Sequence, residues 1–440
     1  PSFAHVIGYV QPPNEEDIAN NPRDAERLLR HPGFRVGKTG VEVAREMDLR
    51  GQAGALKTEV NARGRVIREL PEQSTEPVAG RDVVLTLDAD IQRFAHERLG
   101  PESASAVVMD VNTGELIALV STPSFDPNLF VGGISSADYA ALRDNDHNPL
   151  FQKSIQGTYP PGSTFKAVVA AAALEHGVIP PTERVNCTGS VRLGNREFHC
   201  WRRRGHGPVN LRDAVKTSCD IFFYEIAERL GIDRIHEMAT RFGIGEQFDI
   251  GIAGVRRGNM PNPAWKRARY DQGWSTGDTY NTGIGQGFVT TSPLQLAVMT
   301  ARVASGRAVT PTLYRNAMMP PAAHIGVSDA ALASVRDGLR AVVEEPGGTS
   351  YSLGGLGLGD IEMAGKTGTT PLYSIPAPAR KRGAPDPPRL PPHLRDHRLF
   401  LCSAPHAHAK HASAVVVARG GGSPADHPHP PRPPTTHPPP

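Results

Sequence analysis

The tripeptide Pro160-Pro161-Gly162 stands directly before the most regular helical segment of this 440-residue chain. Proline cannot continue a helix or a central strand, so the element that precedes it must end here. The alanine-rich run 167–174 that follows predicts a helix, and Gly177 predicts where that helix stops. The residues between, Ser163 to Lys166, are therefore expected at the beginning of a helix.

The pair Ser163 and Lys166 is three residues apart at this helix start, so we expect both side chains on one face. A serine hydroxyl becomes a good nucleophile when a base removes its proton, and a lysine whose charge is disfavoured by burial can be that base. The helix N-terminus also suits a developing oxyanion. Taken alone, the pair favours an N-capping serine followed by a surface lysine, because Ser-x-x-Lys is a common pattern.

Two later clusters complete a three-part pattern. Lys216-Thr217-Ser218-Cys219-Asp220 supplies a second hydroxyl beside a carboxylate, and Lys366-Thr367-Gly368-Thr369 follows further along the chain. On an edge strand, the Lys366 cluster would present a cation, and hydroxyls that can bind a carboxylate. Its glycine would let a substrate backbone lie alongside the strand. Ser-x-x-Lys, Ser-x-Asp and Lys-Thr-Gly in this order indicate an acyl-serine active site.

The rest of the pattern predicts an α+β fold in which an antiparallel sheet lies beside a helical cluster. We expect one long helix over 211–230 and another over 293–304. Predicted strands cover 83–87, 105–111, 115–120, 362–364, 398–403 and 412–418, with Asp88 opening a helix.

This chain resembles a class B penicillin-binding protein of the elongation type, the penicillin-binding protein 2 group. The resemblance covers residues 3–422 and rests on the three clusters together with Gly37-Lys38-Thr39-Gly40, Gly283-Ile284-Gly285-Gln286-Gly287 and Leu394-Arg395-Asp396-His397. It implies a penicillin-binding/serine β-lactamase-like transpeptidase domain over 81–423, with residues 1–80 as part of a non-catalytic pedestal domain. Residues 424–440, rich in proline and histidine, are expected to form a disordered tail.

The resemblance also implies a reaction, the cross-linking of peptidoglycan stem peptides during cell elongation. Ser163 would attack the penultimate D-Ala of a D-Ala-D-Ala terminus and Lys166 would take its proton. Ser218, Asp220 and Lys366 would relay protons, and Thr367, Gly368 and Thr369 would bind the substrate, without a catalytic cofactor. Relatives often have Asn at the position of Asp220. A β-lactam would be trapped on Ser163.

Location and partners follow from the same resemblance. It places the chain in the periplasm, anchored to the inner membrane by a segment that would precede Pro1. A glycosyltransferase of the shape, elongation, division and sporulation family and the rod-shape scaffold are the expected partners.

Three cysteines and a histidine, Cys187, Cys200, His206 and Cys219, match the ligand number and type of a tetrahedral zinc site. Their spacing is not that of a zinc finger, but some relatives of the elongation type carry zinc in this region. A structural Zn²⁺ here would brace the loop of Ser218, since Cys219 is its neighbour. Two alternatives to zinc remain: a disulfide between two of the three thiols, or thiols that are simply buried. His199 is the alternative imidazole ligand.

Other functions are disfavoured. Lys+Arg 48 against Asp+Glu 45 leaves a net charge of +3, which offers no broad field for nucleic acid. Gly37-Lys38-Thr39 lacks the glycine spacing of a phosphate-binding loop, so Lys38 is expected to be solvated or structural. A serine β-lactamase and a non-catalytic sensor of β-lactams or wall precursors stay as alternatives that acylation kinetics would separate.

Overall fold

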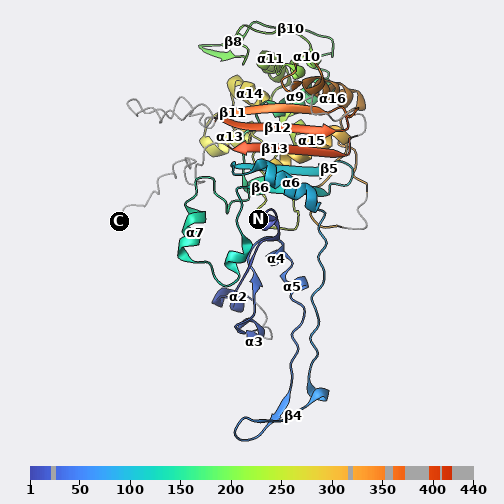
Figure 1. Ribbon diagram of the computed structural model, residues 1–440. Helices are drawn as coiled ribbons and strands as arrows, with labels where there is room; N and C mark the ends of the chain where they lie inside the picture. The colour runs from blue at the N-terminus through green and yellow to red at the C-terminus, as the bar shows by residue number, and fades with distance from the viewer. Residues whose placement is uncertain (21–25, 316–320, 352–359, 372–395, 407–408, 419–440) are drawn as a thin grey trace, which may run out of the picture.

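The computed structural model describes residues 1–20, 26–315, 321–351, 360–371, 396–406 and 409–418. A five-stranded antiparallel sheet in the order β11-β12-β13-β5-β6 forms its centre (Figure 1). The strands are β5 (Ala104–Asp110), β6 (Leu116–Thr122), β11 (Ala364–Pro371), β12 (Asp396–Ala404) and β13 (His411–Ala418). The predicted α+β class, with an antiparallel sheet beside helices, is confirmed.

The sheet joins two hairpins that are far apart in the sequence. β5 and β6 form the early hairpin, and β13 pairs with β5 through registers such as Val416 with Ser105. Among the strands that the structure describes, β11 pairs with β12 alone and so lies at one edge of the sheet. The Lys-Thr-Gly cluster therefore lies on an edge strand, as the sequence predicted.

Helices cover both faces of the sheet. α6 (Ala89–Leu99) lies against β5 and β6, and its N-cap residue Asp88 accepts hydrogen bonds from the N–H groups of Asp90 and Ile91. On the other face, α15 (Pro293–Ser305) contacts β13, β5 and β12, while α16 (Asp329–Glu344) contacts β11 (Figure 1). Behind these helices, α9 (Lys166–Glu175) is buried from its first residue to Ala173, as expected for a helix that is apolar all round.

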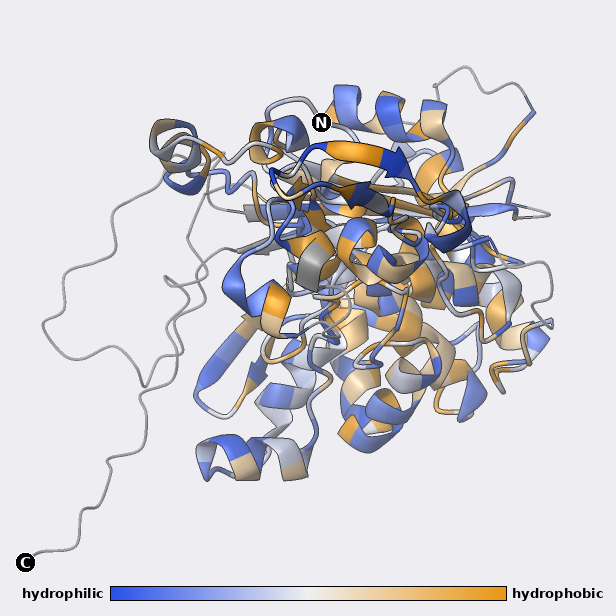
Figure 2. Ribbon diagram, turned by 90° about the horizontal axis from the view of Figure 1, so that it is seen from below, coloured by the Kyte–Doolittle hydropathy of each residue, from blue (hydrophilic) through white to orange (hydrophobic). Residues whose placement is uncertain are grey.

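A helical cluster stands beside this layer and carries the second motif. Its helices are α10 (Leu211–Lys216), α11 (Asp220–Leu230), α12 (Ile232–Arg241), α13 (Pro263–Tyr270) and α14 (Thr276–Gly283). Four short strands join it: β7 (Val185–Cys187), β8 (Ser190–Leu193), β9 (Arg196–His199) and β10 (Gly207–Val209). Figure 2 shows hydrophobic residues gathered toward the interior and hydrophilic residues on the outer turns.

The N-terminal region consists of short elements, and its long β3–β4 hairpin extends away from the sheet (Figure 1). Lys38 pairs with Asp17, so its role in the described structure is structural. The domain boundary near residue 80 stays a prediction. The elements are α1 (Ala4–Ile7), β1 (Val10–Gln11), α2 (Glu15–Ala19), α3 (Glu26–Leu29), β2 (Val36–Gly37), α4 (Gly40–Ala44), α5 (Glu46–Leu49), β3 (Thr58–Val60), β4 (Val66–Glu69) and η2 (Pro71–Gln73).

Two predicted elements were wrong in detail. The helix expected over 211–230 is two helices, because Ser218 adopts a left-handed backbone (φ 55°) that ends α10 before α11 begins. The strand expected over 83–87 makes a single bridge, between Leu85 and Tyr314, because its hydrogen bonds go to an irregular segment.

The remaining differences concern ends and ranges. A strand was predicted over 362–364, but β11 begins only at Ala364 and continues to Pro371. The remaining elements are η3 (Pro127–Phe130), α7 (Ser136–Arg143), α8 (Lys153–Gln156) and η4 (Gly162–Phe165). Within the described residues, no helix combines the length and hydrophobicity that a bilayer crossing requires. The predicted tail 424–440 and residues Leu394 and Arg395 lie outside the described residues.

Candidate active site

The serine of the first motif lies in a 3₁₀ turn, η4, and α9 begins only at Lys166. The predicted α-helical start at Ser163 is thus corrected by three residues. A 3₁₀ turn has three residues per turn, so Ser163 and Lys166 still share one side. Gly162 opens the turn with φ 54°, a conformation that suits glycine, and its N–H donates to the Gly285 carbonyl at 2.8 Å. Pro161 and Gly162 therefore set the turn, as expected.

The amine of Lys166 is fully buried, and it contacts the residues of the second motif. Its Nζ lies 2.6 Å from Asp220 Oδ1, 2.9 Å from the Ser218 carbonyl oxygen and 3.2 Å from Ser218 Oγ. Among the described residues, the Ser163 hydroxyl has no hydrogen-bond partner, and its side chain is half-buried. The lysine and the second hydroxyl are thus in contact, with the lysine held by Ser218 and Asp220, and Ser163 lies one turn before the lysine.

The second motif is a turn that accepts hydrogen bonds from two N–H groups of Trp201, one in its side chain and one in its backbone. Trp201 Nε1 donates to the carbonyl oxygens of Thr217 at 3.0 Å and Ser218 at 3.1 Å. The Trp201 N–H donates to Asp220 Oδ2 at 2.8 Å, so both carboxylate oxygens are engaged. These bonds satisfy the polar groups of a turn whose serine has a sparsely populated backbone conformation.

Lys366 of the third motif is the second buried lysine of the site. Its side chain is almost fully buried, and Nζ donates to the Thr367 carbonyl oxygen at 3.2 Å. Burial lowers the pKa of Lys366 well below its usual value, and the charge of Lys166 lowers it further, while Asp220 opposes the shift. The three motifs therefore interact electrostatically in one buried site.

β11 packs directly on the serine turn. A methyl group added at Gly162 would lie 2.7 Å from Thr370 Oγ1 and 3.1 Å from the Thr369 carbonyl oxygen, and one added at Gly368 would lie 2.9 Å from the Pro161 carbonyl oxygen. Thr370 Oγ1 donates to the Pro160 carbonyl at 3.1 Å. Only glycines allow this approach, which places the exposed Thr369 and the half-buried Thr367 beside the Ser163 turn.

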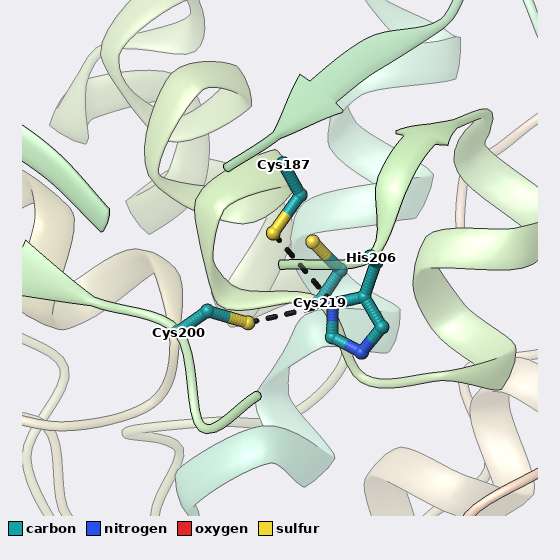
Figure 3. Close-up of side chains that lie close together, drawn as sticks. All are labelled: Cys187, Cys200, His206 and Cys219. Carbon is teal, nitrogen blue, oxygen red and sulfur yellow. Dashed lines mark hydrogen bonds between the residues drawn. The ribbon is translucent and has the colours of Figure 1, made fainter. Parts of the chain in front are cut away.

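The four predicted metal ligands converge (Figure 3). One ligand atom from each of Cys187, Cys200, His206 and Cys219 lies within 4.8 Å of the others. His206 Nδ1 is 3.6 Å from Cys187 Sγ and 3.5 Å from Cys200 Sγ. All four cysteines of the chain, each within the described residues, are free thiols, so the structure contains none of the disulfides left open by the sequence. His199 instead faces Glu197 on the exposed side of β9.

The chain matches two family models and several curated proteins. Residues 104–378 match the penicillin binding protein transpeptidase domain, and residues 1–85 match the penicillin-binding protein dimerisation domain. The peptidoglycan D,D-transpeptidase MrdA of Escherichia coli K12 is 36% identical over 439 residues, which cover 96% of this chain and 68% of that protein. The chain belongs to the penicillin-binding protein transpeptidase family.

Solved structures of this family agree with the fold. Pseudomonas aeruginosa PBP2 in complex with WCK 5153 matches with a TM-score of 0.78 and 34% identity, covering 96% of this chain and 86% of that one. Helicobacter pylori PBP2, solved in complex with MreC, matches with a TM-score of 0.82 and 28% identity, covering 95% and 74%. The transpeptidase fold expected from the resemblance is therefore confirmed.

Two residues that contact the motifs of this penicillin-binding protein were not predicted from the sequence. Trp201 follows Cys200 and holds the Ser218 turn, and Thr349 Oγ1 lies 2.9 Å from Thr367 Oγ1. Neither contact has a local sequence signal, although the tryptophan beside a predicted ligand and the Gly347-Gly348 pair before Thr349 are visible in the sequence.

Proposed function

We infer that the chain is an acyl-serine D,D-transpeptidase that cross-links peptidoglycan stem peptides during cell elongation. One observation carries the inference: the hydrogen bonds of Lys166 to Ser218 and Asp220 join the first motif to the second, beside a β11 strand that packs on the Ser163 turn. The relatives named above are D,D-transpeptidases or PBP2 proteins, which supports the same reaction.

The proposed first step is acyl transfer to Ser163. Its Oγ attacks the carbonyl carbon of the penultimate D-Ala, the C–N bond to the terminal D-Ala breaks, and an ester forms. Lys166 first gives its ammonium proton to the Asp220 carboxylate, along the 2.6 Å hydrogen bond between them. The neutral amine then takes the Ser163 hydroxyl proton, and Ser218 relays this proton from Lys166 to the departing amine. Hydrogen bonds of ligand-free sites are often long and shorten in the substrate complex, so the absence of a Ser163 to Lys166 bond in the described structure is compatible with this role.

The second step returns the enzyme to its starting state. The amine of a neighbouring stem peptide attacks the ester carbonyl and the C–O bond to Ser163 breaks. Lys166 carries the proton of the attacking amine to Ser163 Oγ, which recovers its hydroxyl. N–H groups of Ser163 and Thr369 are proposed to stabilise the oxyanion in both steps. Thr367 and Thr369 are proposed to bind the substrate carboxylate, with Gly368 allowing close approach.

A β-lactam tests this proposal directly. Attack by Ser163 opens the ring and gives a lasting adduct, because the leaving amine stays attached to the inhibitor. Intact-mass measurement after incubation with benzylpenicillin should show one penicilloyl group per wild-type chain and none on Ser163→Ala. Rapid loss of the adduct would indicate a β-lactamase instead. An absent adduct on wild type would contradict the acyl-serine chemistry, and an adduct without D-amino-acid exchange into stem peptides would indicate a sensor.

We further propose that Cys187, Cys200, His206 and Cys219 hold a structural Zn²⁺. The residues fit such an ion: three buried thiols and an imidazole offer four soft or borderline ligands within 4.8 Å of one another. Close backbone contacts shape this site, since a methyl group at Gly205 would lie 2.1 Å from the Cys187 carbonyl oxygen. Bound zinc would cross-link the loops around the Ser218 turn and would take no part in acyl transfer.

The cellular setting is proposed on the same basis. Helicobacter pylori PBP2 forms a complex with MreC, which supports a rod-shape scaffold as a partner here. A membrane glycosyltransferase of the shape, elongation, division and sporulation family is the second proposed partner. We propose that the catalytic residues work in the periplasm on a chain anchored in the inner membrane, with residues 1–80 as part of the pedestal and 81–423 as the transpeptidase domain. Co-purification of both partners with full-length protein from membranes would test this setting.

A further inference from the structure

The loop that follows α16, residues 345–350, contacts both the second and the third motif. The Thr349 N–H donates to the carbonyl oxygen of Lys216, the last residue of α10, at 3.3 Å. The Thr349 hydroxyl lies 2.9 Å from the Thr367 hydroxyl on β11. One residue thus connects the helix that leads into the Ser218 turn with the strand proposed to bind the substrate carboxylate.

Backbone contacts fix the shape of this loop. A methyl group at Gly348 would lie 2.3 Å from the Val342 carbonyl oxygen and 2.5 Å from that of Ala341, so the chain folds back on the end of α16. The Gly348 N–H donates to the Glu345 carbonyl at 3.0 Å, and the Ser350 N–H donates to the Val342 carbonyl at 3.0 Å. Thr349 is therefore held between two anchored neighbours.

A charge cluster ties the same loop to α10. The Glu345 carboxylate accepts hydrogen bonds from Arg212 at 3.1 Å, from Lys216 at 3.0 Å and from Arg340 at 3.3 Å. Arg212 and Lys216 belong to α10, and Arg340 belongs to α16. The Glu345 carboxylate therefore connects the loop to both α10 and α16 on the side of Thr349 that faces α10.

We propose that Thr349 is a positioning residue that orients the Thr367 hydroxyl toward the substrate carboxylate. A hydroxyl has one proton and can accept further hydrogen bonds, so Thr367 can donate to an anion while it accepts from Thr349. Such a chain of hydrogen bonds strengthens each member. This inference rests on the proposed function, because it assumes that a carboxylate-bearing ligand binds beside β11.

The test compares two ligands that differ only in the carboxylate. Second-order acylation rates are measured by intact mass with benzylpenicillin and with its methyl ester, on wild type, Thr349→Val and Thr349→Ser. Valine keeps the shape and removes the hydroxyl, whereas serine keeps the hydroxyl. We expect Thr349→Val to lower the rate with benzylpenicillin about tenfold, to change the rate with the ester less than about twofold, and Thr349→Ser to restore the rate.

Controls separate this role from a loss of folding. The ratio of the two rates within one variant does not depend on the fraction of folded protein, and Thr349→Ala provides a second variant without the hydroxyl. Thr182→Val, at an exposed threonine outside the motifs, should leave both rates unchanged. Thr349→Val could lower the acylation rates with benzylpenicillin and with the ester equally, or could lower neither. If the wild type is acylated, either result would overturn the role of Thr349 and leave the proposed function standing. Wild type that neither compound acylates would overturn the proposed function itself.

Discussion

The Lys166 amine lies 2.6 Å from Asp220 Oδ1, and this bond connects the residue beside the nucleophile to the first residue of α11. Both groups are buried, so the lysine charge is compensated within the protein rather than by water. Removing one partner of a buried pair leaves the other charge uncompensated, which is costly. Loss of either member of this pair should therefore disturb the contact between the first two motifs.

Asp220→Asn and Asp220→Ala should differ in acylation rate. Lys166 and the Trp201 N–H donate to different oxygens of Asp220, and asparagine replaces one of these oxygens by an NH2 group that cannot accept, so one of the two donors loses its acceptor. We expect about a tenfold loss of the benzylpenicillin acylation rate for asparagine and a loss of about a hundredfold for alanine, measured by intact mass. Asp233→Asn, at an exposed aspartate of α12, is the matched control. A wild-type rate in Asp220→Ala would show that the carboxylate does not support Lys166.

Trp201→Phe tests the support of the Ser218 turn. Phenylalanine keeps a ring but lacks the indole N–H that donates to the Thr217 and Ser218 carbonyl oxygens. We expect the acylation rate to fall about fivefold, because each lost hydrogen bond costs about 1 kcal/mol and the turn relaxes in part. Trp265→Phe serves as the control, since its side chain makes ring contacts at α13. An equal effect of both substitutions would argue against a specific role of Trp201.

The zinc content of Cys187→Ser, compared with that of the wild-type protein, tests the metal proposal. Wild-type protein purified without a His tag should contain about one zinc per chain, and Cys187→Ser should retain little of it and unfold at a lower temperature. Cys402→Ser is the control, because Cys402 contacts Ser413 on the sheet and lies outside the cluster. Elemental analysis that finds no zinc in the wild-type protein would reject the site.

Lys366→Met should stabilise the fold in a pH-dependent way. Burial lowers the folded-state pKa of Lys366, so between that pKa and the unfolded value of about 10.4 the unfolded chain binds more protons. Wild-type stability then rises with pH across this window, while the methionine variant lacks this contribution. Urea unfolding should show the variant's advantage largest at neutral pH and shrinking toward pH 10. Lys57→Met, at an exposed position, should show no such trend. A constant difference across this range would contradict the lowered pKa.

Glu345→Gln should weaken the fold at neutral pH but not in acid. Hydrogen bonds from Arg212 and Lys216 lower the pKa of Glu345 from 4.5 to about 2. A lowered carboxylate pKa gives stability that is present above the unfolded value and is lost as pH falls toward 2. Because water screens this cluster, we expect about 1 kcal/mol at pH 7 in urea unfolding and a vanishing difference near pH 2. Glu237→Gln, in an exposed pair with Arg241, should have a smaller effect. Equal curves for Glu345→Gln and wild type at pH 7 would refute this contribution.

The sequence predicted what local patterns determine. Pro160-Pro161-Gly162 marked the serine turn, and the Lys-Thr-Gly cluster was correctly placed on an edge strand. The break at Ser218 was missed, because a continuous helical pattern hides a left-handed residue that tertiary contacts to Lys166 and Trp201 maintain. That the three cysteines and His206 lie together was predicted from their residue types. Their spacing in the sequence did not predict how they are arranged in space. The contact of Thr349 with Thr367 joins separate elements, which no local pattern could indicate.

The order of strands in the central sheet has a consequence for biosynthesis. A ribosome makes β5 and the Ser163 turn long before β13, the strand that pairs with β5. A chain whose translation stops before residue 411 would lack β13, the strand that joins β12 to β5, and would expose an open, apolar strand edge. Incomplete copies would then be unable to close the central sheet and would be prone to aggregation.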